Sequence, residues 1–269
     1  MTETKLRVGA LACLAALATR GASAQNEDEL AKQVSNPISS LISVPLQLNY
    51  DTGLGPNDDG GRVQLNVQPV IPVSISKDWN MISRTIVPII YQSGVFPGEG
   101  SQLGTGDVLQ SLFFSPKAHT ASGWIWGIGP ALSLPLASDD LLGTGKWSAG
   151  PTGIALRQTD SGWTYGALIN QIWSFAGDGD RSDVSSLFLQ PFLAKAIGKG
   201  RTITLNSESS YDWKAGQWTV PLILTYSKVS KIGKQPVSFA GGFRYFADAP
   251  DNGPKWGVRF ALTLLYPQH

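Results

Sequence analysis

Cysteine, histidine and charge are all scarce in this chain. The single cysteine, Cys13, lies within the first 24 residues, so removal of that segment leaves neither a disulfide nor a thiol nucleophile. Charged residues make up 15% of the chain and the net charge is +1, whereas soluble proteins carry about 25% charged residues. This weak charge excludes an electrostatic nucleic-acid binder. Beyond residue 24 there is also no apolar run of about 18 residues, which excludes a transmembrane helix.

Residues 1–24 have the pattern of a cleaved secretory signal. Lys5 and Arg7 form a basic start, an apolar stretch follows, and Ala22-Ser23-Ala24 matches a small-x-small cleavage site. The apolar stretch is too short to cross a membrane as a helix. The alternatives are an ordinary N-terminal helix and a lipoprotein signal at Cys13, although few apolar residues precede that cysteine.

The segment from Trp256 to Tyr266 alternates between large apolar residues and small or polar ones. The apolar positions are Trp256, Val258, Phe260, Leu262, Leu264 and Tyr266. A period of two predicts an extended strand with one apolar face, and about 9–11 tilted residues let a strand cross a bilayer. Arg259, in the middle of the opposite face, would be costly in lipid but is normal in a wet lumen. The segment therefore predicts one strand of a transmembrane β-barrel.

The same alternation recurs along the chain, most weakly in the fourth, sixth and eighth strands. In the eighth, Leu187, Leu189 and Leu193 compete with Phe188 and Phe192 for the outer face. The sequence predicts an all-β fold, a closed antiparallel transmembrane β-barrel of about twelve strands over residues 44–269, with a secreted β-sandwich as the alternative. The expected strands are about 44–52, 62–75, 79–92, 106–117, 123–136, 147–158, 162–175, 184–196, 201–213, 217–229, 236–247 and 256–266.

The connections between these strands alternate in length. An even number of strands leaves both chain ends in the periplasm, with long loops outside and short turns inside. The long connections are 53–61, 93–105, 137–146, 176–183 and 248–255, and 214–216 is an exception. The short ones are 76–78, 118–122, 159–161, 197–200 and 230–235. A sandwich gives no reason for such an alternation.

Tryptophan and tyrosine gather at the ends of the expected strands, as in the two aromatic girdles of a membrane barrel. At the periplasmic ends lie Trp79, Trp124, Trp163, Tyr226 and Tyr266. At the outer ends lie Tyr50, Tyr91, Trp147, Trp173, Trp213, Trp218, Tyr245 and Trp256.

Proline is frequent inside the expected strands, although a closed barrel has no edge on which to place a missing N–H. The positions are Pro69, Pro72, Pro88, Pro130, Pro151, Pro191 and Pro221. These sites require bulges or local distortions of the ladder.

Several segments resemble a family of Gram-negative outer-membrane β-barrel proteins that are often labelled "transporter" and sometimes "neuromedin U". The chain is likewise similar to the porins grouped with a phenol meta-cleavage degradation pathway. The resemblance covers nearly all of the chain after the signal and implies a barrel in the outer membrane, without implying catalytic or binding residues. The segments are 36–37 with 41–45, 68–72, 83–92, 106–116, 171–177 and 218–221.

The function that this pattern favours is a channel for passive uptake of small solutes, because about twelve strands give a barrel of intermediate width. Mixed charges in the lumen would orient polar solutes across the pore, unless they pair with one another and close it. The candidate lumen-lining residues are Gln47, Asn49, Gln64, Asn66, Gln68, Arg84, Asn206, Glu208, Asp212, Arg244 and Arg259.

Two other functions remain open as alternatives. An outer-membrane hydrolase would usually need a histidine near a nucleophile, but His119 falls in an expected periplasmic turn and His269 ends the chain. A closed structural or adhesive barrel would act through its loops, of which 57–59, 139–140 and 178–183 are acidic. Calcium favours such oxygen ligands, yet no full calcium-binding loop is present, and solvated loop tips explain the acids equally well. We therefore expect no catalytic residue, cofactor or metal.

Residues 25–43 precede the barrel as a periplasmic segment, which either gates the lumen or forms a disordered lead-in. The predicted location is the bacterial outer membrane, reached through the cleaved signal. The expected partners are membrane lipid, lipopolysaccharide and a small solute.

Overall fold

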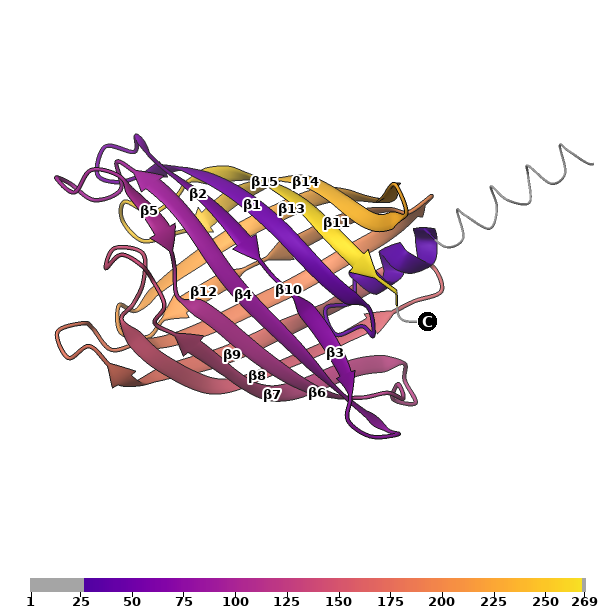
Figure 1. Ribbon diagram of the computed structural model, residues 1–269. Helices are drawn as coiled ribbons and strands as arrows, with labels where there is room; N and C mark the ends of the chain where they lie inside the picture. The colour runs from indigo at the N-terminus through magenta and orange to yellow at the C-terminus, as the bar shows by residue number, and fades with distance from the viewer. Residues whose placement is uncertain (1–26, 268–269) are drawn as a thin grey trace, which may run out of the picture.

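The computed structural model describes residues 27–267, which form a closed β-barrel preceded by a helix at 27–34. The predicted signal at residues 1–24 and His269 lie outside the described residues. Every strand pair is antiparallel, and β1 pairs with β15 to close the ring (Figure 1). Among the described residues, no helix is both long and apolar enough to cross a membrane.

Strands that pair in the wall follow one another along the chain, apart from the closing pair β1–β15 and from three places where two consecutive strands lie end to end without pairing. In chain order the strands are β1 (Ile42–Leu54), β2 (Gly60–Val67), β3 (Val70–Ser74), β4 (Trp79–Ser93), β5 (Gln102–Thr105), β6 (Val108–Pro116), β7 (Trp124–Leu134), β8 (Lys146–Gln158), β9 (Trp163–Gly177), β10 (Ser185–Gly198), β11 (Arg201–Ser207), β12 (Ser209–Asp212), β13 (Gln217–Ile232), β14 (Gln235–Asp248) and β15 (Trp256–Tyr266).

We use the word stave for one complete crossing of the barrel wall. Three staves consist of two strands each, namely β2 with β3, β5 with β6, and β11 with β12. The described barrel therefore has 12 staves, which confirms the predicted architecture. The short turns, the helix and the C-terminal end of β15 lie at one end of the barrel, which we call the turn end, and the longer connections lie at the loop end (Figure 1).

Prolines account for the three interrupted staves, because proline cannot donate to the ladder. Pro69 lies in the gap between β2 and β3. The gap between β5 and β6 faces Pro88, whose carbonyl accepts a 3.0 Å hydrogen bond from the Gly106 amide. Glu208, between β11 and β12, lies opposite Pro221 in the register, and the β13–β14 register shifts at the same proline. The predicted local distortions are thus present at these prolines.

The alternation places apolar side chains on the outer surface and polar side chains in the interior. Leu224 and Phe260 are 54% and 58% exposed on the outside, whereas Asn49 and Arg259 are only 3% and 5% exposed. In a membrane the exposed apolar surface would face lipid. The ambiguous eighth stave, β10, differs, because Leu193 is 42% exposed on the outside while Phe188 and Phe192 pack against the buried interior cluster, so both of its faces carry apolar residues.

Two connections differ from the prediction. The expected loop 93–105 is wrong in part, because its end forms β5 and pairs with β4 at Gln92 and Gln102. The Gln92 side chain donates to Gln102 Oε1 at 3.1 Å, and this buried amide pair holds a strand in a segment without apolar alternation. The connection 230–235 is shorter than expected, since the hairpin pairs extend to Ile232 and Gln235.

An apolar core fills the interior near the turn end. The members come from six staves and from the segment before β1, and we call this cluster the apolar floor. It comprises Ile38, Val70, Ile82, Phe113, Ile125, Ile154, Leu156 and Leu168, with Phe188 and Phe192 packed against it. Packed side chains therefore fill this side of the barrel interior, while a cavity of about 280 Å³ remains on the side of β10 to β15.

The outer apolar face predicts a depth-dependent effect of charge. Leu224→Arg, at the middle of β13, should destabilise the barrel in lipid by about 2–4 kcal/mol, because an arginine at the bilayer midplane is poorly solvated. Ile232→Arg, on the same face at the end of the same strand, should cost only about 0–1 kcal/mol. Denaturant unfolding in phospholipid vesicles measures both values, and equal costs would contradict a membrane-spanning orientation.

Candidate functional site

Neighbouring staves bring polar side chains together on one part of the inner wall. The register pairs Asn49 of β1 with Arg259 of β15 on one side and with Gln64 of β2 on the other. Two residues further along β1, Asp51 is opposite Arg62. Because alternate positions share a face, and directly opposed Cβ atoms lie about 4.5–5.5 Å apart, these side chains form one contiguous group.

A bidentate ion pair crosses the interior between staves that do not touch. Arg259 on β15 donates through Nη1 and Nη2 to the two carboxylate oxygens of Glu208, each at 2.7 Å. The Arg259 Nε atom donates to Asn49 Oδ1, also at 2.7 Å. The side chains of Arg259 and Glu208 are 6% and 22% exposed, so both charges are largely withdrawn from solvent. Paired N–H···O bonds of this kind fix the geometry of both partners.

A second ion pair lies closer to the loop end and passes over a glycine. Arg244 Nη1 on β14 donates to Asp51 Oδ2 on β1 at 3.0 Å. The strand between them, β15, places Gly257 opposite both residues. A Cβ atom at Gly257 would collide with the Asp51 carboxylate and the Tyr50 carbonyl, so glycine permits the pair to bridge the intervening strand.

The two remaining interior arginines are held by amides rather than by carboxylates. Arg84 donates to Gln68 Oε1 at 3.1 Å, and Arg62 donates to Gln92 Oε1 at 2.9 Å. Glu208 is close enough to Arg84 to interact with it electrostatically. We call Asp51, Arg62, Arg84, Glu208, Arg244 and Arg259 the interior charge cluster, in which four arginines face two carboxylates.

The structure places the remaining predicted candidates around this cluster. Gln64 donates to Asn66 Oδ1 at 2.8 Å. Gln47 and Asn206 line a cavity of about 280 Å³ together with Gln68, Arg84 and Arg259. Asp212 lies apart from the group, in a larger cavity at the loop end.

The sequence-based candidates omitted two charged members of the cluster, Asp51 and Arg62. Both lie on the same alternating faces as predicted candidates, Asp51 two residues after Asn49 and Arg62 two residues before Gln64. The strand period was therefore sufficient to find them, although their partners were not predictable from it.

The segment before β1 closes the turn end of the barrel. Ile38 is 5% exposed and belongs to the apolar floor. Leu30, Ala31 and Leu41 form a second buried cluster with Val229 and Leu265 of the wall. This arrangement is an ordered, docked structure for residues 27–41, which differs from a disordered lead-in.

Two hydrogen bonds tie the helix to the short turns. Asp28 Oδ1 accepts a bond from the Gly200 amide at 2.6 Å, and the Lys32 carbonyl accepts one from Gln158 Nε2 at 2.8 Å. Figure 1 shows the helix at the turn end, beside the end of β15. The docked segment lines the same cavity of about 280 Å³ as Arg84 and Arg259, so it lies directly on the turn-end side of these charges.

The acidic loops bind parts of their own chain in the structure. Asp58 pairs with Lys255, and Asp139 Oδ1 accepts a 2.8 Å bond from the Leu141 amide. Asp178 Oδ1 accepts a bond from the Asp180 amide at 3.0 Å. Within residues 27–267, no group of three His, Cys, Asp or Glu side chains is arranged to hold a metal ion. His119 is exposed in the turn between β6 and β7, at the turn end.

Comparison with solved structures shows the fold. The chain is similar to an outer membrane channel from Pseudomonas putida F1, with 12% identity, a TM-score of 0.65, and coverage of 84% of this chain and 96% of the channel. It is also similar to outer membrane phospholipase A from Escherichia coli, with 11% identity, a TM-score of 0.50, and coverage of 84% and 90%. The β domain of the Bordetella autotransporter BrkA matches at 9% identity and a TM-score of 0.48, over 85% of this chain and all of that domain.

No protein-family model matches the chain, and no curated protein matches it. At these identities the likeness shows the closed β-barrel fold alone and does not decide between a channel and an enzyme.

Because Arg259 and Glu208 form a buried ion pair, we predict that the losses of stability from removing each of them are strongly non-additive. Arg259→Ala should destabilise the barrel by about 3–5 kcal/mol, because Glu208 loses its bidentate partner while its carboxylate stays buried. Glu208→Ala should be destabilising for the same reason, and the double variant should cost clearly less than the sum of the two. Denaturant unfolding in vesicles gives the three values.

The exposed pair Lys77–Asp78, with side chains 90% and 69% exposed, provides a control for this cycle. Lys77→Ala should leave stability unchanged within error, since solvent screens such pairs. Additive effects at Arg259 and Glu208 would show that the interior pair carries no coupling.

Proposed function

We propose that the chain is an outer-membrane channel for passive passage of small polar solutes. The observation that carries this proposal is the interior charge cluster, which lines a closed barrel of intermediate width with guanidinium, carboxylate and amide groups. A barrel that served only as a scaffold could fill its interior with apolar side chains, as the apolar floor does at the turn end. Burying these charges costs desolvation free energy, and a pathway for polar solutes explains why they are nevertheless in the interior.

The balance of charge in the cluster determines whether anions or cations pass more easily. Four arginines face two carboxylates in the cluster, and the side-chain hydrogen bonds of Arg62 and Arg84 go to amide oxygens, which carry no net charge. Rings of arginine or lysine favour anions in pores. We infer that anions carry most of the current when the channel is open.

The segment 27–41 is the gate of this channel. It docks through Ile38 in the apolar floor and through the hydrogen bonds at Asp28 and Lys32, so the barrel is closed at the turn end while it is in place. Undocking would remove Ile38 from the floor and lengthen the polar pathway toward the periplasm. Of the two roles considered for this segment, a gate and a disordered lead-in, we therefore favour the gate.

The outer membrane is the location that fits this function. The outward apolar surface would contact lipid and lipopolysaccharide, and the solved structures that share the fold are outer-membrane proteins. The cleaved signal at residues 1–24 would provide export.

Single-channel recording tests the gate. The chain from residue 25 onward, refolded and placed in planar bilayers, should be closed for most of the time, and deletion of residues 25–41 should raise the open fraction at least severalfold. Ile38→Asp should act in the same direction, because a carboxylate is unfavourable in the apolar floor. Ser40→Ala, at an exposed position of the same segment, should behave as the parent chain.

The outcomes separate the gate from the channel. Equal recordings from the parent and the deletion variant would reject the gate. If neither the deletion variant nor Ile38→Asp conducts, although both show β-rich circular dichroism and a heat-dependent gel shift, the channel proposal itself is wrong.

The charge balance predicts the selectivity of the open variant. In a potassium chloride gradient the reversal potential of the deletion variant should indicate anion preference, and Arg84→Gln should reduce it because one interior positive charge is lost. Arg157→Gln, at an exposed position of β8, is the matched control and should leave the reversal potential unchanged. Cation preference in the deletion variant would contradict the proposed role of the cluster.

A further inference from the structure

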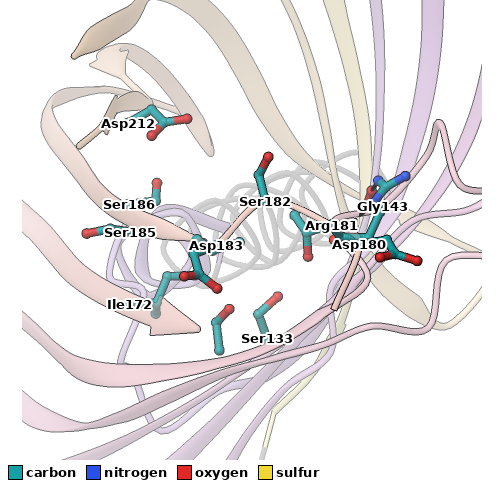
Figure 2. Close-up of a pocket in the computed structure, with 13 residues that line it drawn as sticks. Ser133, Gly143, Ile172, Asp180, Arg181, Ser182, Asp183, Ser185, Ser186 and Asp212 are labelled. Carbon is teal, nitrogen blue, oxygen red and sulfur yellow. Dashed lines mark hydrogen bonds between the residues drawn. The ribbon is translucent and has the colours of Figure 1, made fainter. Parts of the chain in front are cut away.

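A second cavity, at the loop end, has a chemistry unlike that of the interior charge cluster. It has a volume of about 660 Å³ and is lined by β7, β8, β9, β10, β12 and the connections before β8 and β10. Figure 2 shows its serine and aspartate side chains around a common space. We call it the outer cavity. Its size falls in the range of small-molecule sites, about 300–1,000 Å³.

Hydroxyl groups dominate the wall of the outer cavity. They belong to Ser133, Ser148, Ser182, Ser185, Ser186 and Thr144. A hydroxyl group both donates and accepts hydrogen bonds, whereas a carboxylate only accepts them. Three carboxylates complete the lining, those of Asp180, Asp183 and Asp212. The wall therefore suits a ligand that offers several donors and acceptors at once.

One of these hydroxyl groups is buried and has no partner among the described residues. Ser148 is 1% exposed, and its Oγ makes no hydrogen bond within residues 27–267. It lies on the inner face of β8 and contributes to the wall of the outer cavity. Buried polar groups are generally hydrogen-bonded, and an exception requires an explanation. The Ser148 Oγ is closed off from the cavity in this arrangement, so a ligand seated there would supply the missing partner after a rotation of the serine side chain.

The positive groups near the outer cavity are held by the chain itself. The Arg181 guanidinium donates through Nε and Nη2 to the carbonyls of Asp140, Gly143 and Thr144, which fixes the loop and leaves only the Nη1 hydrogens for a ligand. Lys146 lies 3.5 Å from Asp183, so its charge is offset locally. Asp212 accepts the amides of Lys214 and Ala215 through Oδ1 alone, which leaves Oδ2 for a ligand as far as the described residues show.

We propose that the outer cavity binds a neutral polyhydroxylated solute, a sugar or a polyol. Such a molecule carries adjacent hydroxyl groups that donate to the aspartates and exchange hydrogen bonds with the serines. Neither a free anion nor a simple cation uses this combination, because three carboxylates repel an anion and serine hydroxyls add little to cation binding. The site concerns binding at the entrance and does not require the barrel to conduct, so it goes beyond the proposed channel.

Calorimetric titration of the refolded chain tests the site. The detergent must lack a sugar headgroup, because an alkyl glycoside would itself occupy the cavity. Glucose and sorbitol should each bind saturably, whereas succinate and putrescine should not. Ser186→Ala combined with Asp212→Asn should weaken glucose binding about tenfold or more, since a hydrogen bond to a charged group is stronger than one between neutral groups.

Two further variants make the test specific. Ser148→Ala should also weaken glucose binding, and it should leave thermal stability unchanged because its hydroxyl has no partner to lose. Ser101→Ala, at an exposed position of another connection at the same end, should bind glucose as the parent does. Circular dichroism and the heat-dependent gel shift show that each variant is folded.

Three results would overturn the proposal. The first is the absence of saturable binding of both glucose and sorbitol to the folded parent chain. The second is glucose binding that the cavity variants leave unchanged. The third is saturable binding of putrescine alone, which would make the cavity an acidic cation site. Conductance has no part in these measurements, so failure here is separate from failure of the channel proposal.

Discussion

The pairing of β1 with β15 is the constraint on which the rest of the structure depends. It joins residues from Ile42 to Thr52 with residues from Tyr266 back to Trp256, and it removes the two edges that an open sheet would leave. In a bilayer no water is available to satisfy an open edge, so closure must be complete. Closure in turn forces each stave to show one face to the surroundings and the other to a shared interior, which explains the period of two throughout the chain.

The interior of the closed barrel has an apolar part and a charged part. Its turn end is an apolar core that would be ordinary in a soluble domain, and its middle carries buried ions that few soluble domains tolerate. Glu208 connects the backbone of the wall with the buried ions. It lies in the ladder gap opposite Pro221 and reaches Arg259 on a distant stave, so a distortion of the wall carries one half of the interior ion pair.

The features that could be predicted from the sequence are those that follow from the alternation of apolar and polar residues within single strands. Strand number, the outward residues of β15 and the position of Arg259 all depend on alternation within a dozen residues, and the distortions at proline depend on a missing N–H. The strand β5 was missed because its stability comes from the Gln92–Gln102 amide pair rather than from apolar alternation. The partners of Arg259 and Arg244 were beyond reach as well, since Glu208 and Asp51 are 51 and 193 residues away in sequence. The docking of Ile38 likewise depends on side chains from six staves, which form one cluster only when the sheet curls.

The adjacency of Ile42 and Tyr266 has a consequence for the order of assembly. The first and last strands of the sheet are partners, so the contact of largest sequence separation in the wall is the one that completes it. Until then the nascent sheet has two free edges with strongly apolar alternation, which are templates for pairing with any other extended chain. Ile38 lies only four residues before Ile42 and packs inside the finished ring. The N-terminal segment must therefore either lie inside the curling sheet when the β1–β15 pair forms, or thread into the closed ring afterwards. In the first case the segment is a core around which the sheet curls.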